Sequence, residues 1–265
     1  MKVFESNVFF NISSHQQSRP AVLSFGTSSR AYKNNRETPV QDNLVLSNTW
    51  LFRDDVDWNR LAKYMEKTFQ NKGRVHLYSV AASDGSEAFT LAMTLDKLFK
   101  KKTLKKFLPI KASDRDEVIV NASQSGLINL RAKDIIRIVE KDIEPKKYFT
   151  VSKKRLSIED DARVPGMHTY KISNFLKDAV VFEKAELLDR LKSIEDNSNT
   201  VVFCRNVTPY LSPSEVLDVA LVASKKLKKG SIFVIGKYDS NTDIADYLKN
   251  LGFQCVMRNV FQKVV

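Results

Sequence analysis

The sequence predicts an α/β fold whose core is an open, mostly parallel sheet, and two patterns carry this prediction. Short apolar runs of strand length alternate along most of the chain with longer segments in which apolar residues recur at helical spacing. The chain then finishes with two neighbouring strands, Phe253–Arg258 and Val260–Val265, that no helix separates. Because two strands joined by a short turn run antiparallel, we expect the last strand to oppose the parallel ones.

The stretch Arg74–Lys100 is the clearest unit of this fold, because it contains a strand, a tight turn and a helix in succession. The apolar run Val75–Ala82 has the length of a buried parallel strand and ends at Ser83–Gly85. Apolar residues then recur through Ala88–Phe99 at a spacing that places them on one face of a helix. Backbone N–H groups at such a helix N-terminus can cradle a cofactor. Ala81–Glu87 is therefore either a cofactor site or an ordinary turn.

Composition indicates a globular chain of 265 residues, which is ample length for a buried core. The formal net charge of +12 suits a nucleic acid, a membrane surface or an acidic protein as partner. Many Lys-rich proteins, however, are basic for no functional reason. No apolar run reaches membrane-spanning length, so membrane insertion is not expected.

Cysteine and histidine usage bears on compartment and metals. Cys204 and Cys255 each lie in an apolar run and are expected to be buried free thiols, which is typical of a cytoplasmic protein. His15, His76 and His168 are isolated from one another and have no metal-ligand spacing. We therefore expect no metal site.

The chain divides into a polar N-terminal arm, residues 1–46, and a domain, residues 47–265. The arm is rich in polar residues and has little to bury. In Ser47–Arg53, by contrast, polar groups alternate with aromatics before an amphipathic helix at Asp57–Phe69. This segment either covers a sheet edge or places Arg53 in a cleft, where its guanidinium needs an anionic partner such as a ligand carboxylate.

Asp114 directly follows the second predicted strand, Phe107–Ser113. At the carboxyl end of a strand in such a sheet, a carboxylate accepts hydrogen bonds from both ribose hydroxyls of a nucleoside. The same residue could instead cap the helix Glu117–Ser123. The sequence alone leaves both roles open.

Residues 127–165 break the alternation of strands and helices and are expected to form a small inserted subdomain. They contain a charged helix at Ala132–Lys141 and a short strand at Tyr148–Val151, with Pro145 and Pro165 as breaks. Insertions at the carboxyl edge of such a sheet usually shape access to the substrate.

The main sheet is expected to resume after this insertion. We predict the third strand at His168–Ile172, followed by Asn174 and Phe175, and a helix at Glu183–Ile194.

The fourth and fifth strands flank a well-marked helix. Arg205 and Asn206 stand at the carboxyl end of the fourth strand, Thr200–Cys204. A serine cap and a proline in the first turn then start a helix within Ser212–Leu227, and the fifth strand follows at Ser231–Gly236.

The antiparallel ending separates this fold from ordinary dinucleotide dehydrogenases. It matches the seven-stranded sheet of S-adenosylmethionine-dependent methyltransferases, whose last strand is antiparallel. We therefore predict a Rossmann-like methyltransferase sheet with a small inserted subdomain.

Four motifs give the chain a resemblance to the chemotaxis receptor methyltransferase (CheR) family, over roughly residues 45 to 240. Ser47–Arg53 is similar to the family's Asn-x-Thr-x-Phe-Phe-Arg, and Ser79–Thr90 to its Ala-Ala-Ala-Ser-Thr-Gly-Glu-Glu-Pro-Tyr-Ser. Ala112–Ile128 is similar to its Ala-Ser-Asp followed by Ala-Arg-Ser-Gly-Ile, and Phe203–Leu211 to its Phe-Cys-Arg-Asn-Val-x-Ile-Tyr-Phe. The resemblance implies transfer of a methyl group from S-adenosylmethionine to protein glutamate side chains, with S-adenosylhomocysteine as product.

The resemblance also implies a role for each matching residue. Ala81 would offer its backbone to the cofactor, Glu87 would bind the cofactor's amino group, and Asp114 would hold the ribose hydroxyls. Asn174 and Phe175 would flank the adenine. The remaining positions implied to bind the cofactor are Ser47, Thr49, Arg53, Arg205 and Asn206.

Arg53 and Tyr210 are the catalytic residues that the resemblance implies. Arg53 would lie near the transferable methyl group, and the Tyr210 phenol would orient the acceptor carboxylate. Because a carboxylate is already ionised at neutral pH, positioning should matter more than acid–base chemistry. A basic surface suits an acidic helical segment of a receptor as the protein partner, whereas only the net charge supports a nucleic acid.

The chain departs from the family at several positions. Ser47 stands where the family has Asn, and Gly236-Lys237-Tyr238-Asp239 where it has Gly-His-Ser-Glu. The polar arm takes the place of the family's helical N-terminal domain. Three interpretations stay open: a receptor-type carboxylate methyltransferase, a methyltransferase acting on RNA, a small molecule or another protein, and a non-catalytic protein that retains the cofactor site.

Overall fold

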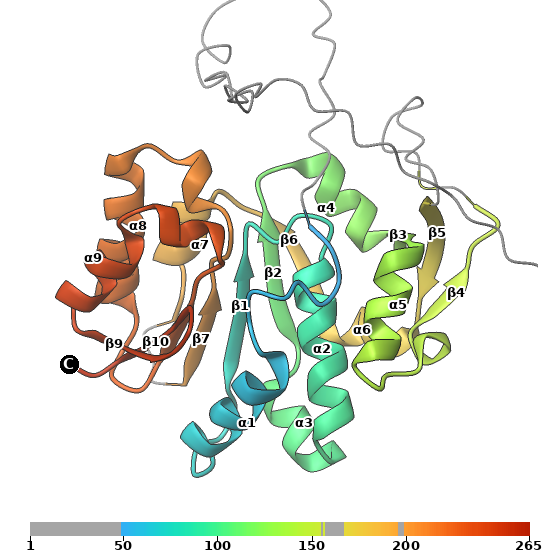
Figure 1. Ribbon diagram of the computed structural model, residues 1–265, viewed down its shortest axis with the longest axis horizontal. Helices are drawn as coiled ribbons and strands as arrows, with labels where there is room; N and C mark the ends of the chain where they lie inside the picture. Colours follow the sequence, from blue (N-terminus) through green and yellow to red (C-terminus); the bar gives the residue numbers. More distant parts are fainter. Residues whose placement is uncertain (1–48, 155, 157–166, 196–198) are drawn as a thin grey trace, which may run out of the picture. The chain divides into compact units, whose positions relative to one another are not determined.

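The computed structural model describes residues 49–154, 156, 167–195 and 199–265. The polar arm, residues 1–46, and Ser47 lie outside this described part. A sheet of seven strands, in the order β6-β2-β1-β7-β8-β10-β9, runs through it (Figure 1). The strands are β1 (His76–Val80), β2 (Ile110–Asp114), β6 (Val180–Lys184), β7 (Thr200–Phe203), β8 (Ile232–Val234), β9 (Phe253–Met257) and β10 (Val260–Lys263).

The direction of the strands confirms the predicted fold class. Neighbouring strands from β6 to β8 pair in parallel. The last strand, β10, lies between β8 and β9 and is antiparallel to both. Only Arg258 and Asn259 separate β9 from β10, and Asn259 has a left-handed φ of 64°. Asparagine tolerates this conformation better than most residues, so it allows the tight turn.

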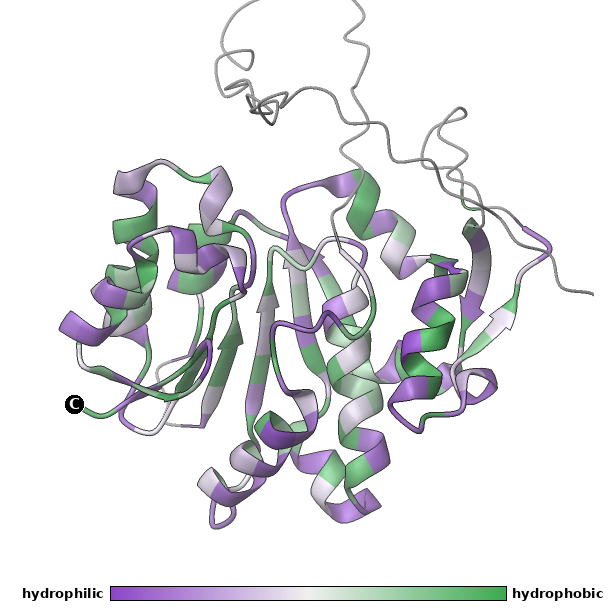
Figure 2. Cartoon of the chain, viewed as in Figure 1, coloured by the Kyte–Doolittle hydropathy of each residue, from purple (hydrophilic) through white to green (hydrophobic). Residues whose placement is uncertain are grey.

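Helices cover both faces of this sheet. The described part of the chain contains the helices α1 (Trp58–Thr68), α2 (Ser86–Leu98), α3 (Lys101–Phe107), α4 (Glu117–Gln124), α5 (Ala132–Glu140), α6 (Asn174–Ala179), α7 (Leu187–Lys192), α8 (Pro213–Lys226) and α9 (Ile244–Asn250). Because side chains alternate along a strand, Leu77 joins the core beneath α1 and α2, whereas Tyr78 joins the core beneath α7, α8 and α9. Figure 2 shows β7 as largely hydrophobic, while α8 and α9 carry hydrophilic and hydrophobic residues in alternation.

The predicted helix start at Ser212 is confirmed. The Ser212 hydroxyl accepts a hydrogen bond from the Glu215 backbone N–H, and the Glu215 carboxylate accepts one from the Ser212 backbone N–H at 2.7 Å. Pro213 occupies the first turn of α8, where its missing N–H costs nothing.

The prediction of a main-sheet strand at His168–Ile172 is wrong. The segment forms β5 (Met167–Ile172), the middle strand of a second sheet of order β3-β5-β4, with β3 at Leu127–Arg131 and β4 at Phe149–Val151 (Figure 1). Most β5 side chains are at least partly exposed, which fits the polar residues in its sequence. The small sheet therefore extends past the predicted end of the insertion at residue 165.

The strand that completes the parallel part of the main sheet is β6, which the sequence analysis assigned partly to a helix at Glu183–Ile194. Only Leu187–Lys192 of that range is helical. The strand has three apolar residues, Val180–Phe182, and follows α6 directly, with no glycine or proline to mark its start. Short apolar runs of this kind do not separate strand from helix.

The cysteine prediction is half wrong. Cys204 is buried and Cys255 is exposed, and both are free thiols. Cys255 lies on β9, the edge strand, where alternate side chains face away from the core. Burial raises the pKa of the Cys204 thiol well above its usual value.

Candidate active site

The turn between β1 and α2 brings unusual backbone geometry to the carboxyl edge of the sheet. Ala81, Ser83 and Gly85 have φ values of 54°, 50° and 84°, all in the left-handed region. A side chain at Gly85 would also meet the Phe182 ring at 2.4 Å, so only glycine fits there. Two non-glycine residues in this conformation cost free energy, which is typical of a functional turn.

Asp114 points into this turn. One of its carboxylate oxygens accepts a hydrogen bond from the Ser83 backbone N–H at 2.8 Å, and the other from the Asp116 N–H at 3.1 Å. The cap of α4 is Asp116, whose carboxylate accepts from the backbone N–H of Val118 and Ile119. The alternative of Asp114 as the helix cap is therefore wrong, and its carboxylate lies beside the β1–α2 turn.

Glu87 lies in the first turn of α2 and joins β1 to the loop after β7. Its carboxylate accepts a hydrogen bond from the Ser79 hydroxyl at 2.6 Å and one from Arg205 Nη1 at 2.7 Å. Burial raises the pKa of Glu87, although Arg205 opposes the shift. The structure thus brings together Glu87 and Arg205, two residues that the sequence analysis named separately.

Asp55 is a member of the site that the sequence analysis missed. Its carboxylate accepts hydrogen bonds from Arg205 Nη2, from Asn206 Nδ2 at 3.0 Å and from the Lys237 backbone N–H at 3.1 Å. Burial favours a raised pKa for Asp55, but Arg205, Asn206 and Lys237 outweigh it and hold the pKa below its usual value. Asp55 therefore stays ionised and fixes both Arg205 and Asn206.

Asp239 also holds these loops in place, and the sequence analysis missed this role as well. It is fully buried and accepts hydrogen bonds from the backbone N–H of Asn206 at 2.5 Å, of Thr208 at 3.0 Å and of Gly236 at 2.6 Å. Burial raises the pKa of Asp239 against the effect of these bonds. The carboxylate thereby joins the loop after β7 to the loop after β8.

Tyr210 lies on the surface of this region. It ends a short 3-10 helix, Thr208–Tyr210, directly after the Asn206 loop, and its side chain is 74% exposed. The structure thus places the phenol where an incoming molecule can reach it.

Arg53 lies near Asp55 and contacts two aromatic rings. Its Nε is 3.9 Å from the Asp55 carboxylate, and its guanidinium carbon is 4.4 Å from the Trp50 ring centroid and 5.1 Å from that of Tyr238. Thr49 joins the site through its backbone carbonyl, which accepts a hydrogen bond from Arg131 Nη2 at 3.4 Å.

Asn174 and Phe175 do not share these contacts. They begin α6, where Asn174 is exposed and the Phe175 ring packs 5.9 Å from that of Tyr148. The strand before them belongs to the small sheet, so they do not follow a main-sheet strand. At the corresponding end of β6, the Ala185 backbone N–H donates to the Asp114 carbonyl at 2.9 Å.

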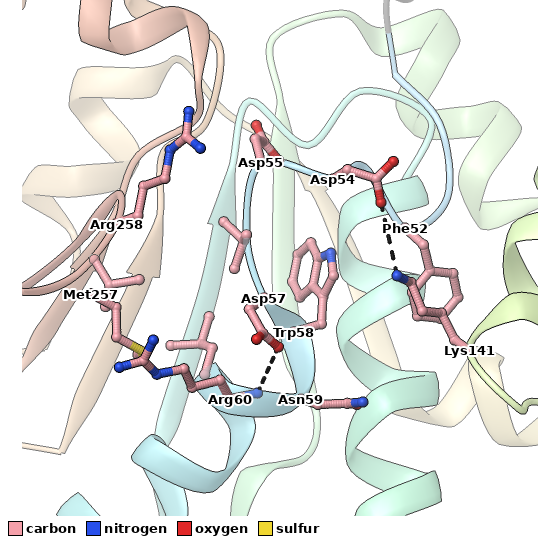
Figure 3. Close-up of a pocket in the computed structure, with 13 residues that line it drawn as sticks. Phe52, Asp54, Asp55, Asp57, Trp58, Asn59, Arg60, Lys141, Met257 and Arg258 are labelled. Atoms are coloured by element: carbon pink, nitrogen blue, oxygen red, sulfur yellow. Dashed lines mark hydrogen bonds and ion pairs between the residues drawn. The ribbon is translucent and has the colours of Figure 1, made fainter.

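A pocket of about 420 Å³ opens beside Asp55 (Figure 3). Figure 3 shows Arg258, from the β9–β10 turn, on one side of the lining residues and Lys141, paired with Asp54, on the other. The pocket is lined by Phe52, Asp54, Asp55, Val56, Asp57, Trp58, Asn59, Arg60, Leu61, Lys141, Met257, Arg258 and Val260. Asp55 lines this pocket although its side chain is only 3% exposed.

Among the described residues, no group of three or more His, Cys, Asp or Glu side chains could hold a metal ion. No helix in the same part of the chain is both long and apolar enough to cross a membrane.

The donors and acceptors of the site fit a ligand with two different ends. Asp114 and the strained turn offer a carboxylate and backbone groups, which suit a ribose with neighbouring hydroxyls. Glu87 and Arg205 offer opposite charges 2.7 Å apart, which suit the ammonium and carboxylate of an amino-acid end. The arrangement therefore suits a ligand in which a nucleoside is joined to an amino acid.

Comparison with known proteins gives a family match across most of the chain. Residues 47–257 match the family model described as CheR methyltransferase, SAM binding domain. Chemotaxis protein methyltransferase 1 of Pseudomonas aeruginosa is 27% identical over 213 residues, which cover 78% of this chain and 71% of that protein. The chemotaxis protein methyltransferase of Vibrio parahaemolyticus is 26% identical over 216 residues, which cover 80% and 72%.

Similarity to solved structures is more distant. A precorrin-6y C5,15-methyltransferase from Geobacter metallireducens has 10% sequence identity and a TM-score of 0.38, and the match covers 78% of each chain. The fold assignment therefore rests on the strand order of the protein itself.

Proposed function

The chain belongs to the CheR methyltransferase family and is thus an S-adenosylmethionine-dependent methyltransferase, and from this premise we propose that it methylates carboxylate side chains of a protein. The observation that carries the proposal is that two charged arrangements lie at one edge of the sheet. Asp114 faces the β1–α2 turn, and Glu87 pairs with Arg205 in the loop after β7. The relatives are chemotaxis protein methyltransferases, which favours glutamate side chains of a receptor as acceptor.

We assign the cofactor's parts to residues by their chemistry. Asp114 would accept hydrogen bonds from the ribose hydroxyls, and the backbone of Ala81 would line the cofactor beside it. Glu87 would bind the ammonium group, while Arg205 would lie against the carboxylate. Because β6 and not β5 belongs to the main sheet, residues 185–187 replace Asn174 and Phe175 in our proposal for the adenine pocket.

Arg53 and Tyr210 would serve the acceptor. S-adenosylmethionine supplies a methyl group on a positively charged sulfur. An acceptor carboxylate oxygen forms the new C–O bond as the S–CH₃ bond breaks, which gives a neutral ester and S-adenosylhomocysteine and requires no proton transfer. Arg53 would hold the carboxylate in line with that bond, and the Tyr210 phenol would orient it by a hydrogen bond.

The basic net charge of +12 supports an acidic protein segment as the partner. We place the reaction in the cytoplasm, a reducing compartment that suits two free thiols. The same net charge is the only feature that favours RNA as the acceptor. We therefore do not propose a nucleic acid acceptor, and the test of the product below would detect one.

The cofactor site is tested by calorimetric titration with S-adenosylmethionine and S-adenosylhomocysteine. We expect micromolar binding by the natural protein and a loss of at least about tenfold in affinity in Asp114→Ala, since a charge-assisted pair of hydrogen bonds is removed. Asp116→Ala is the matched control, because this carboxylate caps α4 and does not face the turn. Equal binding by the Asp114 variant and the natural protein would contradict the assignment.

The acceptor is tested by the chemistry of the product. The protein is incubated with radiolabelled S-adenosylmethionine and purified receptor signalling fragments, and methanol release is measured after mild base. Carboxylate esters release methanol, whereas methylated amines and RNA bases do not. Label that is stable to base would contradict a carboxylate acceptor and indicate another class of acceptor. Cofactor binding without any methyl transfer would favour a non-catalytic protein.

A further inference from the structure

Both tryptophans of the chain pack against an arginine of the site. The sequence has two tryptophans, Trp50 and Trp58. The Arg53 guanidinium carbon lies 4.4 Å from the Trp50 ring centroid, and that of Arg205 lies 4.8 Å from the Trp58 ring centroid. A guanidinium above an aromatic face gains cation–π attraction and keeps its N–H bonds in the plane, where they can donate to an anion.

Arg53 differs from Arg205 in having a second ring. Tyr238, in the 3-10 helix after β8 (Tyr238–Asn241), places its ring centroid 5.1 Å from the Arg53 guanidinium carbon. Arg53 is therefore held by rings from two loops that are far apart in the sequence.

The Trp50 ring is itself held by the inserted subdomain. Arg137 on α5 lies 5.4 Å from the Trp50 ring centroid, and its Nη1 donates to the buried Asp134 carboxylate at 3.1 Å. Arg131 donates to the Thr49 carbonyl at 3.4 Å, next to Trp50 in the chain. These contacts connect α5 to Trp50 and, through its ring, to Arg53.

We propose that Trp50 and Tyr238 are positioning residues that hold the Arg53 guanidinium in its orientation for methyl transfer. The proposal rests on the proposed function, because it is Arg53 that would hold the acceptor. Each ring adds a weak cation–π attraction that favours one orientation of the flexible Arg53 side chain.

The rings and not the tyrosine hydroxyl carry this role, and the chain allows a clean separation of the two. Tyr238 is 47% exposed, so its replacement leaves no large cavity. Tyr238→Leu removes the ring and keeps an apolar side chain. Tyr238→Phe keeps the ring and removes only the hydroxyl, and Trp50→Leu and Trp50→Phe form the equivalent pair.

The test combines three measurements on these four variants of the full chain. Calorimetry gives the affinity for S-adenosylhomocysteine, methanol release from receptor fragments gives kcat and KM, and the Arg53 Nε–Hε signal in a proton–nitrogen NMR spectrum reports the ring stack. The signal is assigned by its absence in Arg53→Lys. Ring currents shift a group stacked on an aromatic face, so the signal moves when a ring is lost.

We expect both leucine variants to lose about tenfold in kcat, since small errors of position in the transfer site are costly. Acceptor KM and S-adenosylhomocysteine affinity should change less than about threefold, and the Arg53 signal should move toward that of an exposed arginine. Both phenylalanine variants should stay within about twofold of the natural kcat, since their rings still provide cation–π attraction.

The proposal would be overturned by natural kcat in the leucine variants, or by an Arg53 signal that does not move when either ring is removed. A loss in Tyr238→Phe equal to that in Tyr238→Leu would also overturn it, because the hydroxyl would then be responsible. If no acceptor is methylated by the natural protein, the proposed function fails, and the NMR signal still decides whether the rings hold Arg53.

Discussion

Arg205 and Arg53 belong to the same site but are held by different kinds of contact. Arg205 has a side chain only 3% exposed and lies between the carboxylates of Asp55 and Glu87. Arg53 has a side chain 12% exposed, and one carboxylate lies 3.9 Å from its Nε. Two aromatic rings also lie against its guanidinium.

The difference separates folding from function within one site. Buried charges depend on their partners, because an ion left unpaired in the interior carries a large desolvation cost. Asp55 also joins Asn206 and Lys237, so the pairing of Arg205 connects three loops to the core. An aromatic ring is uncharged, so it carries no comparable desolvation cost when the cation beside it is removed. We therefore expect Arg205 to support both stability and binding, and Arg53 to support activity alone.

The largest expected effect comes from removal of the buried cation. Arg205→Leu should lower the free energy of unfolding by about 3–5 kcal/mol, because the buried carboxylates of Asp55 and Glu87 lose the cation that lies between them. Urea denaturation followed by circular dichroism measures this change.

The control is a variant that removes the charges together. Arg205→Leu combined with Asp55→Asn and Glu87→Gln should recover part of the loss, since no buried ion is then unpaired. A loss of less than about 1 kcal/mol in Arg205→Leu alone would mean that the two arginines do not differ in this way.

The next-largest effect concerns Asp84, whose pKa is set mainly by burial and not by a neighbouring arginine. Burial raises the pKa of Asp84 to about 6, from an ordinary value of 3.8, and Arg131 opposes this only weakly. Because the folded-state pKa lies above the unfolded one, the protonated group is favoured in the folded protein. Its stabilising contribution is complete below about pH 4 and is lost as the pH rises through about 6.

Asp84→Asn removes this titration. The amide oxygen can still accept the hydrogen bond from the Ser86 N–H, which is 2.8 Å long in the natural protein. The variant should exceed the natural protein in free energy of unfolding by about 1–2 kcal/mol at pH 8 and match it near pH 4. This value is smaller than the full pKa shift would give, because the Asp84 carboxyl is partly exposed. Glu117→Gln is the opposite control, because the Lys184 hydrogen bond lowers the pKa of Glu117. Equal stability of Asp84→Asn and natural protein at pH 8 would count against the raised pKa.

Local patterns in the sequence predicted the parts of the fold that neighbouring residues determine. The β1–α2 turn, the helix start at Ser212 and the antiparallel ending each depend on a few consecutive residues, and each was found. β6 was missed because three apolar residues after a helix carry no distinct period.

Contacts between distant residues explain what the sequence missed in the site. Asp55 and Arg205 are 150 positions apart, and Asp239 bonds to Thr208 across 31 positions. Nothing near either aspartate indicates a buried partner. Asp114 could be singled out because strand ends meet at one sheet edge, whatever the rest of the chain does.

The smallest expected change in stability comes from Arg53, and it tests the comparison most directly. Arg53→Leu should alter the free energy of unfolding by less than about 1 kcal/mol, because two cation–π contacts and a long ion pair are lost and Asp55 keeps Arg205 as its cation. Methyl transfer should fall by about 100-fold, since a charge that holds the acceptor is removed. Arg53→Lys keeps the charge without the flat guanidinium and should fall between the two. Urea denaturation and methanol release on the same preparations measure both quantities. Stability lost in Arg53→Leu to the same extent as in Arg205→Leu would show that both arginines support the fold, and the separation of folding from function would then be wrong.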